Sequence, residues 1–360
     1  MHILNGPFLA AGYERLLTGQ PFRKAAKVLA GLLGRPARLG GKTERGPGMS
    51  VAEELAGRLA DGEVVIIDGG TGTQLQAVGV PMDDDTWSGR ANLEQREVVQ
   101  RVHEAYIRAG AEVIITNTFA ASRAALEPAG LGGRVADANR NAVVAALRAR
   151  EAAADGRAVA VAGSMSPFCP IVTHGRNETG AAADCFPSLA NFREQAGLLA
   201  EAGVDLIALE LMEAPGYGHA ALQAATETGL PVWLGFSAVR LDDGSLGADP
   251  ALGEGDSFAE LVRKLADPGL AAVSVMHAKP DVSLEAIDII RAEFAGPIGV
   301  YAESGSWTAP EWVFDEHPPG QYLQEAIAWT ERGAQIIGGC CGIGPEHIKI
   351  LADHLPRRTR

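Results

Sequence analysis

From residue 50 onward, the chain repeats one pattern: a short apolar run, a polar or glycine-rich turn, and a longer amphipathic segment. The apolar runs are almost continuously hydrophobic, which is typical of strands that are buried on both faces of a parallel sheet. Eight runs are predicted to be strands: Val64–Ile67, Glu112–Ile115, Ala158–Ala162, Asp205–Leu209, Val232–Phe236, Ala271–Met276, Pro297–Tyr301 and Ala334–Ile337.

The segments between these runs have the spacing of amphipathic helices. The predicted helices are Leu93–Ala109, Val135–Ala154, Ser188–Ala202, Tyr217–Glu227, Ser257–Leu265, Leu284–Phe294 and Tyr322–Arg332. Asp256-Ser257 and Gly344-Pro345 are typical of helix starts, because they offer a capping side chain or a first-turn proline.

Gly110, Gly203 and Gly333 each stand shortly before a predicted strand, so we expect each to end a helix in a left-handed conformation. Eight successive β-then-α units predict the α/β class and a (β/α)8 TIM barrel. The competing fold is an open, doubly wound sheet. It is disfavoured because 69–74 does not complete a dinucleotide-binding glycine motif.

Composition narrows the functional class. The chain has 360 residues, of which 47% are hydrophobic, and its net charge is −14. An acidic chain of this size suits an enzyme of small molecules and disfavours a nucleic-acid partner. No apolar stretch approaches the roughly 18 residues that span a bilayer. Four cysteines, two of them adjacent, do not form a disulfide framework, so we expect a cytoplasmic location and no membrane partner.

The charge is divided unevenly along the chain. Residues 1–48 carry eight Lys or Arg and two Asp or Glu, a net charge of +6, which leaves −20 for residues 49–360. We expect 1–48 to be a basic, poorly structured N-terminal extension and 49–360 to be the barrel. A targeting peptide is the alternative for the extension, although no clear cleavage site follows its apolar run.

In a barrel of this class, function lies just past the carboxyl end of each strand. At these positions the sequence has acids, an amide, hydroxyls, a histidine and two adjacent cysteines. The candidate substrate-binding residues are Asp68, Gly69, Asn117, Ser164, Glu210 and Glu303, and the candidate metal ligands are His277, Cys340 and Cys341.

Cys340 and Cys341 are poor partners for a disulfide with each other, because the bridge would strain the peptide between them. Two thiolates at the end of a buried strand favour a soft metal ion, and zinc held by three ligands keeps a position open for a thiol. His277 is the best-placed third ligand, with Cys169 and His174 as alternatives. The opposing interpretation is a pair of small buried side chains.

Asp68 and Glu210 are candidates to hold a substrate ammonium group. The backbone N–H groups of the glycine-rich loop at Gly69, or of a helix start, are candidates for its carboxylate. Structural alternatives stay open. Asp68 could accept hydrogen bonds from its own turn, Glu210 could pair with an arginine, and His277 could be a buried core histidine.

These motifs resemble those of the homocysteine S-methyltransferase family, which includes betaine–homocysteine methyltransferase and the homocysteine domain of cobalamin-dependent methionine synthase. The resemblance covers roughly residues 60–355. It rests on 68–72, 116–119, Gly163-Ser164 with Pro167, 205–210, and Gly338-Gly339-Cys340-Cys341 followed by 345–348. It implies that Cys340 and Cys341 bind zinc and that Asp68 and Glu210 line a homocysteine pocket.

The sequence departs from the family pattern at two places. The family has a cysteine as third zinc ligand in a Gly-Val-Asn-Cys motif, where this chain has Ser274-Val275-Met276-His277. An imidazole in place of a thiolate leaves zinc more Lewis-acidic, and the thiolate of a bound substrate less nucleophilic. The second departure is Glu303, which stands where the family usually has asparagine in Pro-Asn-Ser-Gly.

The sequence therefore predicts a zinc-dependent transferase that moves a methyl group from a sulfonium, ammonium or similar donor to the thiol of homocysteine or a related thiol. The expected partners are a small-molecule thiol and a methyl donor, and a homo-oligomer is compatible with the sequence. No cobalamin-binding module is expected beside the barrel. The alternatives are a metal-free amino-acid-binding barrel and a zinc hydrolase with Glu303 as base.

Overall fold

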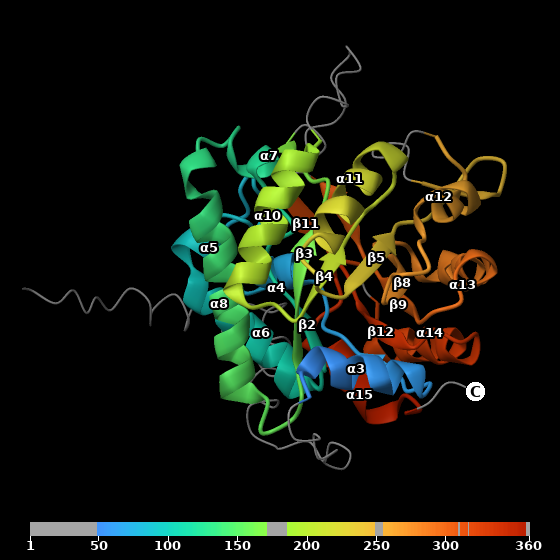
Figure 1. The fold of residues 1–360 in the computed structure, drawn as a ribbon. Helices are drawn as coiled ribbons and strands as arrows, with labels where there is room; N and C mark the ends of the chain where they lie inside the picture. The colour runs from blue at the N-terminus through green and yellow to red at the C-terminus, as the bar shows by residue number, and fades with distance from the viewer. Residues whose placement is uncertain (1–48, 171–185, 249–254, 309, 316, 358–360) are drawn as a thin grey trace, which may run out of the picture. The chain divides into compact units, whose positions relative to one another are not determined.

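The computed structural model describes residues 49–170, 186–248, 255–308, 310–315 and 317–357, which form a parallel barrel surrounded by helices (Figure 1). All eight predicted strands are confirmed, with small shifts at their ends. The barrel strands are β1 (Val65–Ile66), β2 (Val113–Ile115), β3 (Ala160–Met165), β4 (Leu206–Leu209), β5 (Val232–Phe236), β8 (Ala272–Met276), β9 (Ile298–Ala302) and β12 (Ile336–Gly339).

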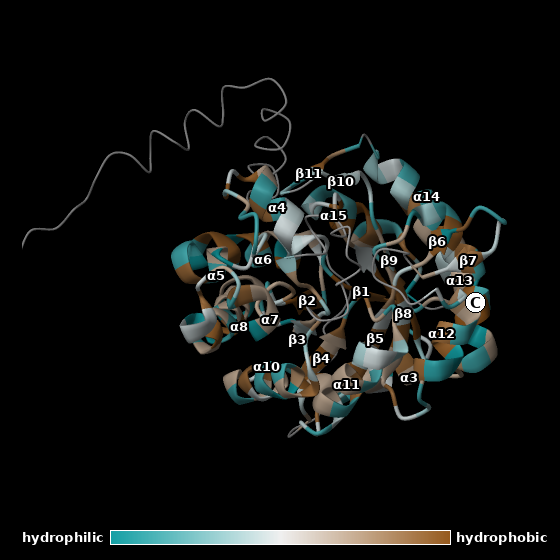
Figure 2. Cartoon of the chain, turned by 90° about the horizontal axis from the view of Figure 1, so that it is seen from above, coloured by the Kyte–Doolittle hydropathy of each residue, from teal (hydrophilic) through white to brown (hydrophobic). Residues whose placement is uncertain are grey.

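The strand order β1-β12-β9-β8-β5-β4-β3-β2 closes on itself, and every neighbouring pair is parallel. Closure comes from a parallel bridge between Ile67 and Val113, and the Asp68 N–H donates to the Val113 carbonyl at 3.0 Å. Seen from above, the strands lie inside a ring of helices (Figure 2). The predicted (β/α)8 TIM barrel is confirmed.

The helices that follow the strands cover the outside of the barrel. They are α4 (Thr71–Ala77), α5 (Ala91–Glu94), α6 (Arg96–Ala109), α7 (Arg123–Leu126), α8 (Val135–Ala153), α10 (Leu189–Ala202), α11 (Pro215–Thr226), α12 (Phe258–Leu265), α13 (Ser283–Glu293), α14 (Pro319–Glu331) and α15 (Pro345–His354). Ser257 caps α12 and Pro345 begins α15, as predicted.

The predicted helix ends are confirmed at the three glycines. Gly110, Gly203 and Gly333 have φ values of 118°, 95° and 96°, a conformation that a side chain disfavours. The single helix predicted over Leu93–Ala109 is wrong. It is divided at Gln95, whose φ of −138° leaves the helical region, because short α5 is held at the barrel mouth while α6 runs along the barrel wall.

The third strand continues further than predicted, so Ser164 lies within β3 rather than after it. Gly163, Ser164 and Met165 pair in register with Ile207, Ala208 and Leu209 of β4. The ladder extends to this point because backbone pairing with β4 holds even where the side chains are small or polar.

A helix that the strand pattern did not predict, α3 (Val51–Ala60), precedes β1. Ser50 and Glu53 form its capping box. Leu55 and Leu59 pack in one cluster with residues of the barrel interior, and Gln335 donates to the Leu59 carbonyl at 2.6 Å. This helix covers the end of the barrel opposite the mouth. The predicted extension 1–48 lies outside the described residues and stays a prediction.

Two hairpins interrupt the regular alternation at the mouth. One joins β6 (Val239–Arg240) to β7 (Leu246–Gly247), and the other joins β10 (Ser306–Thr308) to β11 (Glu311–Val313). Within the described ranges, no helix is both long and apolar enough to cross a bilayer.

His103 on α6 is fully buried, and neither ring nitrogen has a hydrogen-bond partner in the described part of the chain. Burial lowers its pKa to about 4.

As pH falls from about 6.5 to 4, the unfolded chain takes up a proton at His103 that the folded chain does not accept, so stability is lost in this window. We expect His103→Leu to remove about 3 kcal/mol of the acid-induced loss, measured by urea unfolding from pH 7 to 4.

The control for this variant is His354→Gln, which changes a surface histidine. An unchanged pH dependence in His103→Leu would contradict the expected role of the buried imidazole.

Candidate active site

Backbone hydrogen bonds at the mouth bring the ends of β8, β9 and β12 together. The His277 N–H donates to the Tyr301 carbonyl at 3.2 Å, and the Cys340 N–H donates to the Ala302 carbonyl at 2.8 Å. Glu303 follows the strand between them. Parallel pairing thus makes His277, Glu303 and Cys340 neighbours, although 63 residues separate His277 from Cys340 along the chain.

The chain turns sharply after Cys341, and Gly342 makes this turn possible. Its φ is +79°, and an added Cβ would lie 2.0 Å from the Ser304 carbonyl oxygen. Only glycine combines this backbone conformation with so close an approach. The Ser304 N–H donates to the Cys341 carbonyl at 2.8 Å, which fixes the cysteine pair beside β9.

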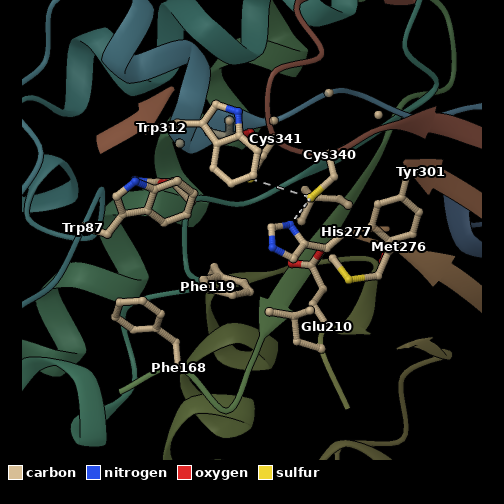
Figure 3. A pocket seen from close by; sticks show the side chains of 18 of the residues that line it. Trp87, Phe119, Phe168, Glu210, Met276, His277, Tyr301, Trp312, Cys340 and Cys341 are labelled. Carbon is tan, nitrogen blue, oxygen red and sulfur yellow. Dashed lines mark hydrogen bonds between the residues drawn. The ribbon is translucent and has the colours of Figure 1, made fainter. Parts of the chain in front are cut away.

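Three side chains form a potential metal site, as predicted from the sequence. His277 Nδ1 lies 3.5 Å from Cys340 Sγ, and the two cysteine sulfurs are 4.0 Å apart (Figure 3). The ligand atoms of His277, Cys340 and Cys341 all lie within 4.8 Å of one another. Both cysteines are free thiols.

Charges at this site are strongly coupled. The pKa of Cys340 is lowered to about 5, because Cys341 and His277 stabilise its thiolate. Burial alone would lower the pKa of His277, but Glu303 and Cys340 outweigh it and raise that pKa well above its usual value. The imidazole and the Cys340 thiolate therefore stabilise each other's charged forms.

Glu303 lies beside His277, outside the cavity wall. Its Oε2 is 2.9 Å from His277 Nδ1, and its Oε1 is 3.3 Å from Lys279 Nζ. Burial raises the pKa of Glu303, but His277 and Lys279 outweigh it and lower that pKa overall. Glu303 thus contacts the same imidazole nitrogen that faces Cys340, and its expected contact with the substrate stays a prediction.

A cavity of about 280 Å³ opens beside the metal site, and its walls are mainly apolar. Its aromatic lining consists of Tyr301 in β9 and five residues in the segments after barrel strands, which are Trp87, Phe119, Phe168, Trp307 and Trp312. His277, Cys340 and Glu210 contribute polar groups, and Figure 3 labels all of these residues except Trp307. Of the five, the sequence analysis included only Phe119, within 116–119. The available signal for the others is their place after barrel strands.

Glu210 follows β4 and lines the cavity. Ser164 Oγ donates a short hydrogen bond to its Oε2. Burial raises the pKa of Glu210 to about 7 despite this bond, so the carboxyl is poised to bind a cation. No arginine ion pair holds Glu210 among the described residues.

Asp68 and Gly69 occupy different places at the end of β1. Asp68 is buried below the wall, and its Oδ2 accepts a hydrogen bond from the Ile115 N–H at 2.9 Å. Burial raises its pKa well above the usual range. Gly69 lines the cavity itself, and an added Cβ would lie 2.1 Å from the Ile343 carbonyl oxygen.

Asn117 lies in the cavity wall, but its amide is occupied by the protein. Its Oδ1 accepts from Ser88 Oγ at 2.8 Å, and its Nδ2 donates to the Ser88 carbonyl and to Asn92 Oδ1, both at 2.9 Å. Asn117 therefore fixes the loop that carries Trp87, which is an indirect role in shaping the cavity.

The sequence named two alternative metal ligands, Cys169 and His174. Cys169 is disulfide-bonded, and His174 lies outside the described residues. The disulfide corrects the expectation that the cysteines form none, because spacing along a chain does not reveal which sulfurs approach in space. It is atypical of a reducing compartment, so the cytoplasmic location stays a prediction.

Comparison with known proteins identifies the family. The model of the homocysteine S-methyltransferase family matches residues 65–355. The chain belongs to the homocysteine S-methyltransferase family. Homocysteine S-methyltransferase 1 of Zea mays is 31% identical over 333 residues, covering 86% of this chain and 99% of the relative.

Other family members are similar over comparable lengths. Selenocysteine methyltransferase of Astragalus bisulcatus is 27% identical, covering 80% of this chain and 91% of the relative. The crystal structure of the Escherichia coli homocysteine methyltransferase MmuM in its metallated form has a TM-score of 0.64 and 25% identity. The match covers 84% of this chain and 99% of MmuM.

We expect Asn117→Ala to destabilise the protein by about 2–3 kcal/mol, because it leaves buried polar groups of Ser88 and Asn92 without partners. Urea unfolding measures this loss. In a double-mutant cycle with Asn92→Ala, the double variant should lose less than the sum of the two single variants. Strict additivity would contradict a shared network.

Proposed function

We propose that this chain is a zinc-dependent S-methyltransferase that moves a methyl group from a cationic sulfonium or quaternary ammonium donor to the thiol of homocysteine or a close analogue. The observation that carries the proposal is the convergence of His277, Cys340 and Cys341 at one side of an aromatic cavity that also contains Glu210.

The ligand set fits zinc. Tetrahedral zinc with usual bond lengths places two sulfurs about 3.8 Å apart and a sulfur and a nitrogen about 3.6 Å apart. The corresponding distances are 4.0 Å between Cys340 and Cys341, and 3.5 Å between Cys340 and His277. That MmuM has been solved in a metallated form supports a metal here. When bound, zinc supplies an open position that lowers the pKa of an entering thiol.

Glu210 is proposed to bind the ammonium group of homocysteine. Its carboxyl lies in the cavity wall, and Ser164 orients it through a hydrogen bond. Asp68, buried nearby, adds negative charge to the same region. An ammonium group stabilises the ionised form of Glu210, offsetting the cost of burying a carboxylate.

Two unused hydrogen-bond donors are candidates for a substrate carboxylate. Thr71 Oγ1 and Trp87 Nε1 are buried, have no hydrogen-bond partner among the residues that the structure describes, and belong to residues that line the cavity. A buried donor without a partner is costly, and a carboxylate oxygen would satisfy it. Thr71 follows the glycine-rich loop predicted to serve this purpose.

The aromatic walls favour a cationic donor. The faces of Trp, Tyr and Phe attract sulfonium and quaternary ammonium groups, and the apolar lining removes competing water. In the transfer, the thiolate sulfur forms a bond to the methyl carbon. The bond from that carbon to the donor sulfur or nitrogen breaks, and its electron pair leaves with the neutral donor product.

The hydrolase alternative is disfavoured by the position of Glu303. A base that activates water would face the cavity, whereas Glu303 lies outside its wall and pairs with His277 and Lys279. The homo-oligomer expected from the sequence stays a prediction.

The proposal is tested by zinc analysis and by methionine formation from homocysteine with S-methylmethionine, S-adenosylmethionine or betaine. We expect one zinc per chain and activity with at least one donor. His277→Ala should lose most of the zinc and more than about 100-fold of activity. His219→Ala, at the surface, is the matched control. Carefully purified protein without zinc and without thiol methylation would refute the proposal.

Glu210→Gln should raise the KM for homocysteine by about 10- to 100-fold, since a hydrogen bond to a charged group contributes about 1.5–3 kcal/mol. The KM for 4-mercaptobutanoic acid, which lacks the amino group, should change little. Steady-state kinetics with both thiols checks this, with the surface variant Glu227→Gln as control. Equal effects on the two thiols would exclude ammonium binding by Glu210.

A further inference from the structure

The hairpin of β10 and β11 contributes two tryptophans to the cavity wall, Trp307 and Trp312. These residues are directly opposite each other in the antiparallel register. Opposed residues of two paired strands point to the same face, so the hairpin presents both rings to the cavity. Glu311 and Val313, which flank Trp312 in β11 and point to the opposite face, are exposed, so the hairpin has little protein on its other side.

The position of this hairpin determines the surroundings of the metal ligands. The Trp312 ring lies 5.8 Å from the His277 ring between centroids, and the Trp307 ring lies 6.1 Å from that of Trp87. Trp312 is 4% exposed, and its Nε1 donates to the Ser304 carbonyl at 2.7 Å. A shift of the hairpin would open the wall where a cationic donor is proposed to bind.

A two-stranded hairpin is marginally stable by itself, so it needs an external anchor. Gln76 on α4 provides one. Its Oε1 accepts a hydrogen bond from the Trp312 N–H at 2.8 Å, and its Nε2 donates to the Trp312 carbonyl at 2.9 Å. The carboxamide thus pairs with the backbone of β11 as a neighbouring strand would, across 236 residues of sequence.

Both the carboxamide group of Gln76 and its position on α4 suit it to hold the hairpin. Only a side-chain amide offers one acceptor and one donor in the arrangement of a peptide group, and glutamate would lack the donor. Gln76 also belongs to the helix that follows the glycine-rich loop, so it connects the two sides of the cavity: the β1 loop with Gly69 and Thr71, and the β9 hairpin with Trp312.

We propose that Gln76 is a positioning residue that clamps the β10–β11 hairpin over the metal ligands and thereby sets the affinity for the cationic methyl donor. The donor part of this inference rests on the proposed function. The clamp itself rests on the two hydrogen bonds between Gln76 and Trp312, and can be measured without catalysis.

The test compares zinc-loaded wild type with Gln76→Ala and Gln76→Glu. Hydrogen exchange followed by mass spectrometry should show faster exchange in peptides covering 304–314, with other regions unchanged. The KM for the donor should rise roughly tenfold in Gln76→Ala, as expected for the loss of two hydrogen bonds, while the homocysteine KM changes less than about twofold. Gln76→Glu, which keeps the acceptor, should be intermediate.

Gln74→Ala is the matched control, because Gln74 is on the same helix and no hydrogen bond joins its side chain to the hairpin in the described part of the chain. Zinc content should be equal in all variants, which separates a shifted hairpin from a damaged metal site. A Gln76→Ala protein with wild-type exchange in 304–314 and a wild-type donor KM would overturn the clamp.

The two proposals fail separately. If wild type transfers no methyl group but Gln76→Ala still exchanges faster in 304–314, the clamp is supported and the proposed function is refuted. If wild type is active and both KM values rise equally in Gln76→Ala, the specific effect on the donor is refuted.

Discussion

Parallel backbone pairing of β8, β9 and β12 is the constraint on which the site depends. It places His277, Glu303 and Cys340 at adjacent strand ends, and the ladder continues into the turn through the bond between Ser304 and Cys341. Because the ligands stand on paired backbone rather than on long loops, their separation is set by the spacing of neighbouring strands. The parallel bridge between Ile67 and Val113 closes the barrel, so strand pairing continues around the whole mouth.

Electrostatics explains why these groups tolerate one another in a buried place. Opposite charges on His277, Glu303, Lys279 and Cys340 lie within a few ångströms, where the low local dielectric strengthens their attraction. A thiolate ligand at position 277 would carry a negative charge itself, whereas His277 has the carboxylate of Glu303 beside it. A change in either residue would therefore alter the charge of the proposed metal site.

The aromatic part of the cavity wall is built from loops, which side-chain hydrogen bonds hold in place rather than strand pairing. Asn117 fixes the loop of Trp87, and Gln76 joins the Trp312 hairpin to α4. Side-chain amides thus take the role that backbone pairing has in the barrel. This arrangement separates the proposed metal ligands, which follow strand ends, from the aromatic part of the cavity wall, which is carried mainly by loops. Loops on a rigid scaffold can change specificity without disturbing the chemistry beneath.

The sequence by itself determined the barrel, the strand ends and the three metal-ligand candidates, because periodicity and glycine caps act within about one turn or strand and do not depend on distant residues. It did not reveal α3, the break at Gln95, the cavity wall of Trp87, Trp307 and Trp312, or the disulfide of Cys169. Only the tertiary structure decided these, since closure of the barrel brings together loops whose separation along the chain carries no local signal. It also showed that Asn117 bonds to the loop of Trp87 and that Glu303 contacts His277, while their expected contacts with the substrate stay predictions.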